Sequence, residues 1–215
     1  SITEGGLTYS PHPEFIGITP DAKDSKVILF HDFDNHVPNN NSISGNHGNW
    51  VTGILGANTG NDEGVVGVFP NCRLMSIMHP SGGEAEDEII FNWLAGLAAA
   101  FSSPAFKPVN SLGKDAPFIN NNSWTYPSGY PAIGSALEQA IGNVAVYGRK
   151  GRGTLTFFAS GNENGNVIIE NTLGTHEKVI AVAATSIDDD GFTEIRAGYS
   201  NFGINNEIEF AAPGN

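Results

Sequence analysis

The chain of 215 residues has little cysteine, little positive charge and no long apolar run, and each lack excludes a class of protein. Its single cysteine, Cys72, excludes an internal disulfide and a zinc site built from thiolates, and its apolar surroundings predict a buried side chain. Only 10 Lys and Arg stand against 23 Asp and Glu, so nucleic acid is not a predicted partner. No stretch approaches the ~20 apolar residues of a membrane span, and residues 1–15 carry no signal peptide.

Apolar strands alternate with amphipathic helices along the chain, at a length that predicts one domain over residues 1–215. This alternation predicts an α/β domain with a mainly parallel sheet, helices on both faces and loops gathered at the carboxyl ends of the strands. The strands are expected at 26–35, 73–79, 117–124, 154–159 and 178–185, the helices at 84–101 and 131–147, and a surface loop at 102–116.

The most informative stretch begins at Asn46-His47-Gly48 and continues as a run of small residues to Gly56. A histidine in the first turn of a buried helix is a costly titratable group unless it has a function. A second segment, Gly64 to Leu74, follows about twenty residues later. Together the two segments resemble the subtilisin superfamily, whose signatures are His-Gly-Thr-x-x-Ala-Gly and Gly-x-x-Gly-x-Ala-Pro. The resemblance implies a serine endopeptidase with a three-layer fold, in which His47 is the general base.

The triad acid has two candidates. Glu4-Gly5-Gly6-Leu7 and His12-Pro13-Glu14-Phe15 resemble the kexin-type pair Asp-Asp-Gly-Leu and His-Pro-Asp-Leu, which implies that Glu4 replaces the usual aspartate. Asp32 is the alternative, because it follows an apolar strand. It lies only 15 residues before His47, whereas Glu4 lies 43 residues before it. We favour Glu4, and Asp32 remains open.

His31, Asp32, Asp34 and His36 are metal-ligand types in a short span, so a metallohydrolase is a further hypothesis. Side chains alternate along a strand, which turns His31 away from Asp32 and Asp34. We therefore expect no catalytic metal at this segment.

A polar, glycine-rich loop covers residues 57–65. The subtilase resemblance implies that this loop binds calcium with the side chains of Glu14 and Asn61. Backbone carbonyls near Asn58, Glu63 and Val65 would complete the shell. Oxygen-only ligands of this kind suit Ca²⁺.

Two later segments carry the expected substrate site. Ile119 to Trp124 resembles the subtilase Ile-x-Asn-x-Ser-Trp-Gly. The resemblance implies that Ser123 and Trp124 border the substrate. Thr125-Tyr126-Pro127 follows where the family usually has glycine, and these larger residues would crowd the substrate groove. Ser160-Gly161-Asn162 resembles Ala-Ser-Gly-Asn-x-Gly. The resemblance implies that Asn162 donates its amide to the oxyanion, a contact worth about 3–4 kcal/mol, while Ser160 and Gly161 wall the pocket.

The nucleophile is missing, since no Gly-Thr-Ser occurs in the chain. We expect residues 1–215 to represent about the first three quarters of a catalytic domain, with the serine on a C-terminal segment beyond Asn215. The resemblance implies a polypeptide substrate and an extracellular or cell-envelope location. The alternative is a pseudoprotease that binds peptides or a partner protein, an interpretation that Glu4, Trp50 and Thr125-Tyr126 favour mildly.

Overall fold

A computed structural model describes residues 2–4, 13–15, 26–33, 37–38, 46–78, 83–97 and 108–214. The chain divides into two compact units. The first unit comprises Ser1–Ile90 and Ala100–Lys107, and the second unit comprises Phe91–Ala99 and Pro108–Asn215.

Among its described residues, the first unit contains four strands in the order β3-β2-β4-β1. β4 is parallel to both β1 and β2, whereas the short β3 is antiparallel to β2. Every side chain of β4 is buried, as expected for a strand paired on both edges of a parallel sheet. The bounds are β1 Ile2–Glu4, β2 Val27–Asp32, β3 Val37–Pro38 and β4 Leu74–Met78.

A small apolar core joins the 3-10 helix η1 (Pro13–Phe15) to helix α1 (His47–Gly56). Phe15, Val27 and Leu74 form its centre. Three partly buried side chains pack against that centre: Val51, Leu55 and Cys72. The cysteine predicted to be buried is therefore only partly so.

Helix α1 is less buried than the sequence predicted. Gly48, Thr52 and Gly56 form its buried face. Trp50 and Ile54 are each 66% exposed, and His47 is exposed as well. The prediction of a buried helix was wrong at these positions, because only the small residues Gly48, Thr52 and Gly56 of this helix are buried.

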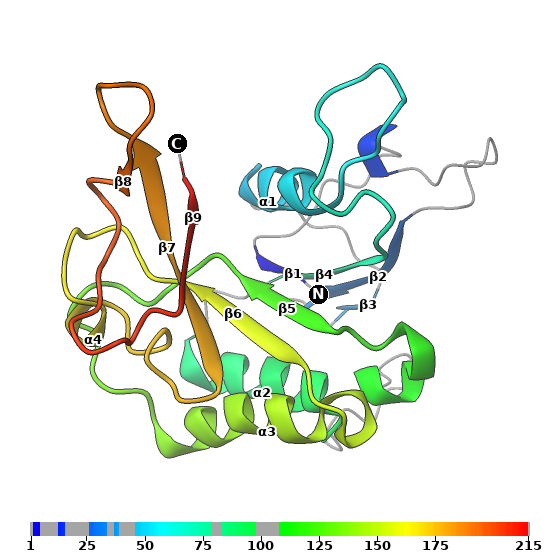
Figure 1. Cartoon of the computed structure of the whole chain (residues 1–215). Helices are drawn as coiled ribbons and strands as arrows, with labels where there is room; N and C mark the ends of the chain where they lie inside the picture. Colours follow the sequence, from blue (N-terminus) through cyan, green and yellow to red (C-terminus); the bar gives the residue numbers. More distant parts are fainter. Residues whose placement is uncertain are drawn as a thin grey trace. The chain divides into compact units, whose positions relative to one another are not determined.

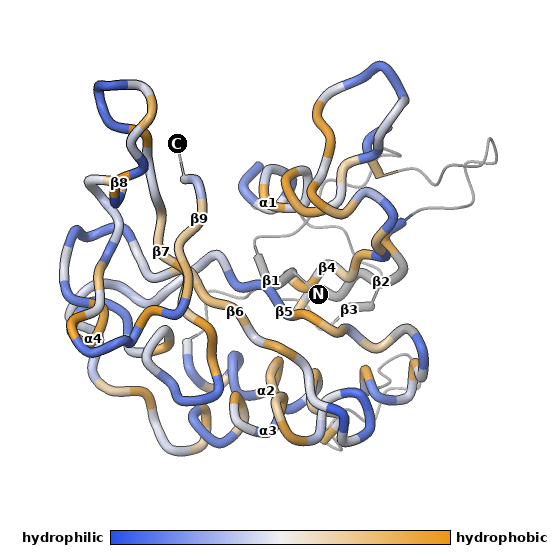
Figure 2. The backbone as a smooth tube through the Cα atoms, viewed as in Figure 1, coloured by the Kyte–Doolittle hydropathy of each residue, from blue (hydrophilic) through white to orange (hydrophobic). Residues whose placement is uncertain are grey.

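The second unit is built on three parallel strands, β5 (Ile119–Asn122), β6 (Leu155–Ala159) and β7 (Val179–Ile187), with β6 in the centre. β9 (Phe210–Pro213) pairs parallel with β7, and β8 (Glu194–Arg196) pairs antiparallel with its last residues (Figure 1). Figure 2 shows β7 hydrophobic in its first half and ending in a hydrophilic loop. The expected mainly parallel α/β arrangement is confirmed.

Where this unit is described, four helical segments belong to it wholly or partly: α2 (Glu84–Ala95), η2 (Val109–Asp115), α3 (Ser135–Gly151) and α4 (Val167–Glu170). α3 packs against β6 (Figure 1). Of the five apolar residues that the sequence predicts to face inward, Ile133 precedes the helix and is only partly buried, and the other four are buried: Leu137, Ala140, Ile141 and Val144. Phe91 of α2 lies 6.1 Å from Phe158 of β6 between ring centroids. Within the described ranges, no helix has the length and apolar character needed to cross a membrane.

Several predicted boundaries were wrong. α2 ends at Ala95 and not at residue 101, because Gly96 adopts a positive φ of +81° that terminates the helix. α3 begins at Ser135 after Gly134, four residues later than Pro131. In the expected loop 102–116, residues 109–115 form a 3-10 helix whose Val109 is wholly buried.

Lys26 is a buried cation in the first unit, with only 8% of its surface exposed. Its ammonium donates a hydrogen bond of 2.8 Å to the carbonyl oxygen of Gly56, at the end of α1, where the helix dipole favours positive charge. Burial lowers the pKa of Lys26, and the neighbouring Cys72 and Glu14 partly offset this effect. Burial raises the pKa of the Cys72 thiol, which the Lys26 charge partly offsets.

The shifted pKa values of Lys26 and Cys72 predict that alkaline pH affects the stability through these two groups in opposite directions. Below its ordinary pKa of 10.5, Lys26 binds protons more weakly in the folded chain than in the unfolded one, so its contribution to the free energy of unfolding rises with pH. Cys72 has the opposite effect above pH 9.0. Its thiol ionises at a lower pH in the unfolded chain than in the folded one, so its contribution to the free energy of unfolding falls as the pH rises. We expect Lys26→Met to make denaturant-measured stability fall more steeply above pH 9.0, and Cys72→Ala to make it fall less steeply. Equal slopes in all three proteins would contradict the prediction.

Candidate active site

His47 is the first residue of α1, and its side chain is exposed. α1 lies beside β1, which ends at Glu4. The hydroxyl of Thr52 donates to the carbonyl of Gly48 at 2.6 Å and braces the turn that carries the histidine. The first unit thus holds an accessible imidazole on a helix adjacent to the strand that ends in the predicted acid.

Both candidate acids end strands that pair with β4. Glu4 of β1 lies opposite Met78, and Asp32 of β2 lies opposite the same residue from the other edge. The backbone therefore places the two candidates at the same level along the sheet, one in each of the two strands that flank β4. The position of α1 next to β1 favours Glu4.

Of the metal cluster considered from the sequence, His31 and Asp32 lie in β2, while Asp34 and His36 lie outside the described residues. Where the chain is described, no group of three His, Cys, Asp or Glu residues is placed to hold a metal ion.

The predicted calcium loop surrounds the carboxylate of Glu14, which is only 5% exposed. Its Oε1 accepts a hydrogen bond from the amide of Val65 at 2.9 Å, and its Oε2 accepts from Nδ2 of Asn61 at 3.5 Å. The backbone carbonyl of Glu14 accepts from the amide of Asn58 at 3.1 Å. The structure thus brings Glu14 and Asn61 together, with Nδ2 of Asn61 facing the carboxylate. The carboxylate and amide oxygens of these two residues are ligand types that suit Ca²⁺.

Gly64 closes this loop with φ of +55°, in the left-handed region that glycine adopts most easily. A Cβ atom at this position would lie 1.8 Å from Oε1 of Glu14. The carboxylate therefore occupies the space that a side chain at position 64 would need.

Ser123 and Trp124 follow directly after β5. Nδ2 of Asn121 donates to the hydroxyl of Ser123 at 3.0 Å. The Trp124 ring meets Phe158 and Tyr126 edge-on, and the buried Tyr126 stacks on Tyr130 with ring centroids 4.2 Å apart. The tyrosine expected to crowd the groove is thus packed within an aromatic group.

The segment Ser160–Gly165 follows β6 and carries the predicted oxyanion donor. Ser160 and Gly161 are buried, whereas Asn162 is exposed. Gly161 has φ of +100°, which turns the chain sharply after the strand. The exposed amide side chain of Asn162 thus projects from a loop whose base is held inside the protein.

Sequence reasoning missed the residue that holds this loop, Asn201. Its side chain is wholly buried and hydrogen-bonds four groups of the Ser160–Gly165 segment. The only local signal for it is a Ser200-Asn201 pair shortly before Gly203, a polar pair of the kind that is common in turns.

Ser160 and Ser200 are not available as nucleophiles. Both are buried, and their hydroxyl oxygens lie 3.5 Å apart. The Ser200 oxygen also accepts from the amide of Ala184 at 2.9 Å, so it serves to join β7 to the following loop.

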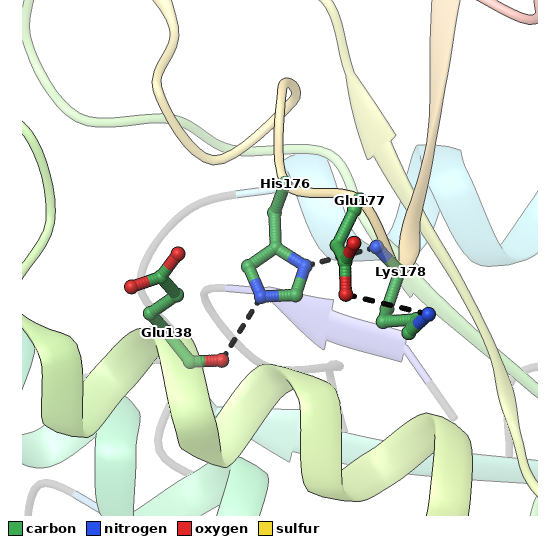
Figure 3. A network of polar contacts seen from close by, with 4 residues as sticks. All are labelled: Glu138, His176, Glu177 and Lys178. Carbon is green, nitrogen blue, oxygen red and sulfur yellow. Dashed lines mark hydrogen bonds and ion pairs between the residues drawn. The ribbon is translucent and has the colours of Figure 1, made fainter.

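A second polar group links α3 to the loop before β7 (Figure 3). Nε2 of His176 lies 3.0 Å from the carbonyl oxygen of Glu138, and Nδ1 accepts from the amide of Lys178 at 3.0 Å. Because Nδ1 accepts the hydrogen bond from the Lys178 amide, the ring proton lies on Nε2, which donates to the carbonyl oxygen of Glu138. An open hollow of about 720 Å³ lies here, and none of its lining residues is a predicted site residue. His176 therefore has a structural role, joining α3 to this loop.

Comparison with known proteins extends over nearly the whole chain. The family described as peptidase S8, the subtilase family, matches residues 9–215. A calcium-dependent protease of Trichormus variabilis is 33% identical over 165 residues, which are 74% of this chain and 22% of that protein. A thermophilic serine proteinase of Bacillus sp. strain AK1 is 27% identical over 214 residues, which are 100% of this chain and 43% of that protein. The chain therefore spans less than half the length of either relative.

Solved structures agree on the fold. Sphericase superposes with a TM-score of 0.65 at 24% identity, covering 99% of this chain and 66% of its own. A cold-adapted subtilisin-like serine proteinase superposes with a TM-score of 0.64 at 18% identity, and the match covers 99% of this chain and 63% of that protein. The fold is subtilisin-like α/β, and the chain belongs to the subtilase family of peptidases.

Proposed function

We propose that residues 1–215 are the incomplete catalytic domain of a serine endopeptidase, with kexin-like features around the acid. The observation that carries this proposal is the exposed His47 on a helix beside the strand that ends in Glu4, within a chain of the subtilase family. The related thermophilic serine proteinase supports the same reaction class.

In this mechanism His47 removes the proton from a serine hydroxyl as that oxygen attacks the peptide carbonyl. It then donates the proton to the departing amine. Glu4 holds the imidazole in the required tautomer, and Asn162 donates a hydrogen bond to the oxyanion. Ser123, Trp124, Ser160 and Gly161 border the polypeptide substrate.

The serine itself lies outside residues 1–215 in this proposal, on a further polypeptide segment of the same protein. An exposed apolar surface of the first unit supports such a partner, because large exposed apolar patches mark interaction sites. It consists of Trp50, Ile54, Val65, Val66, Val68 and Phe69. Backbone hydrogen bonds from Val68 to Ile54 and from Phe69 to Leu55, both 2.9 Å, hold its two segments together.

We also propose that Glu14 and Asn61 hold a structural Ca²⁺, supported by their contact around a buried carboxylate. The name of the calcium-dependent protease relative agrees with a role for this ion. An extracellular or cell-envelope location follows from the family resemblance and belongs to the same proposal.

The triad assignment is tested in the full-length protein with a chromogenic peptide. We expect His47→Ala to lower kcat by about 10⁶-fold, because it removes the base, and Glu4→Gln to lower it by about 10⁴-fold, because it removes the orienting charge. Asp32→Asn is the matched control and should change kcat less than tenfold. A large loss for Asp32→Asn with little loss for Glu4→Gln would reverse the assignment.

Calcium binding is tested with a pair of glycine variants. Gly64→Ala and Gly60→Ala both place alanine at positive φ, at about 1–2 kcal/mol of strain, but only the first meets Glu14, since nothing lies within 4 Å of a Cβ at position 60. We expect Gly64→Ala and Glu14→Gln to abolish the rise in Tm that calcium produces, while Gly60→Ala keeps it. The calcium ligand proposal fails if Gly64→Ala and Glu14→Gln respond to calcium as wild type does.

The location of the nucleophile is tested by labelling the full-length protein with a fluorophosphonate and mapping the modified serine by mass spectrometry. We expect the label outside residues 1–215, and its loss in His47→Ala. An intact protein that takes no label and cleaves no peptide, yet binds peptides, would be the pseudoprotease alternative. A label on Ser123, Ser160 or Ser200 would refute the proposed site.

A further inference from the structure

We infer that Asn201 is a positioning residue that fixes the Ser160–Gly165 segment in the shape that presents Asn162. The catalytic part of this inference rests on the proposed function, in which Asn162 is the oxyanion donor. The inference concerns only residues of the second unit.

The Asn201 side chain uses its full hydrogen-bonding capacity on this one segment. Nδ2 donates to the carbonyl of Ser160 at 2.9 Å and to Oε2 of Glu163 at 2.7 Å. Oδ1 accepts from the amides of Glu163 at 3.1 Å and Gly165 at 2.9 Å. An asparagine has two donor hydrogens and one oxygen with two lone pairs, so nothing is left unused.

These partners also fix which way the amide points. Two N–H groups face Oδ1, and a carbonyl and a carboxylate face Nδ2, so the reversed orientation would set donors against donors. The side chain is 0% exposed, so no water competes for these bonds. An aspartate at this position would face the Glu163 carboxylate and the Ser160 carbonyl without a donor.

Glu163 connects this buried amide to Asn162. Its Oε2, which accepts from Asn201, also accepts from the backbone amide of Asn162 at 2.9 Å. The backbone amide of Asn201 donates to the carbonyl of Gly161 at 3.2 Å, in the same peptide group as the Asn162 amide, and the amide of Glu163, on the other side of Asn162, donates to Oδ1 of Asn201 at 3.1 Å. The chain is thus held immediately before and after Asn162, while the side chain of Asn162 remains exposed.

Asn201 is itself anchored to the sheet. Ser200 bonds the amide of Ala184 in β7, and its own amide donates to the carbonyl of Ala197 at 2.9 Å. On the other side, the amide of Phe202 donates to the carbonyl of Gly165 at 2.9 Å. A fixed donor is what oxyanion stabilisation requires, because a donor that must reorganise during the reaction loses its advantage.

The test uses Asn201→Asp, Asn201→Leu and the double variant Asn201→Asp with Glu163→Gln in the full-length protein. Asn110→Asp is the matched control, since Asn110 also bonds two carbonyls and one amide of the backbone but does not contact Ser160–Gly165. Hydrogen exchange of the peptide that spans residues 160–165 is measured together with kcat and KM.

We expect both single Asn201 variants to speed exchange of this peptide at least tenfold and to lower kcat about 10²-fold with little change in KM, since the oxyanion forms only in the transition state. The double variant should recover part of both losses, because Glu163→Gln gives the introduced aspartate an amide donor in place of a second carboxylate. Asn110→Asp should leave exchange of the peptide unchanged.

Each outcome decides a separate statement. Unchanged exchange in the Asn201 variants would overturn the inference. Faster exchange with unchanged kcat in an active enzyme would overturn its catalytic part. If the wild-type protein is inactive, the proposed function fails, and the exchange measurement alone decides whether Asn201 holds the segment.

Discussion

Parallel pairing of β6 with β5 and β7 is the constraint on which the second unit depends. Parallel strands bring their carboxyl ends to one edge of a sheet, so the polar segments that follow β5 and β6 meet at that edge. The register sets Asn122 of β5 opposite Phe158 and Ala159 opposite Val182. Ser123 and Ser160 therefore follow directly from neighbouring strands at one edge of this sheet.

The loop that follows β6 is held in shape by side-chain hydrogen bonds rather than by backbone pairing with another strand. Asn201 provides the interior partners that a strand would otherwise supply, and Glu163 extends the network to the surface at Asn162. Buried polar networks of this kind are useful only when every member is satisfied, since one unpaired group would cost more than an apolar replacement. Asn201 meets this condition with four bonds.

The first unit solves a related problem around Glu14. A buried carboxylate requires compensation, and here the Val65 amide and Asn61 provide it, while the buried Lys26 supplies opposite charge nearby. Gly64 makes the arrangement possible by removing the side chain that would fill the same space. The buried carboxylate of Glu14 thus depends on a glycine at position 64.

The sequence by itself determined the family, the mainly parallel α/β class and the inward face of α3, because motif spacing and hydrophobic periodicity are local properties. It took α1 for a buried helix, because hydropathy does not show how much of a helix the rest of the fold covers, and both His47 and Trp50 proved exposed. It set the end of α2 too late because Gly96 acts through its φ angle and not through its hydropathy. Only the tertiary structure revealed Asn201, whose partners lie about forty residues away in sequence, and only it placed Glu4 and Asp32 level on either side of β4. Long-range hydrogen bonds and strand register depend on how distant segments meet, which no local pattern encodes.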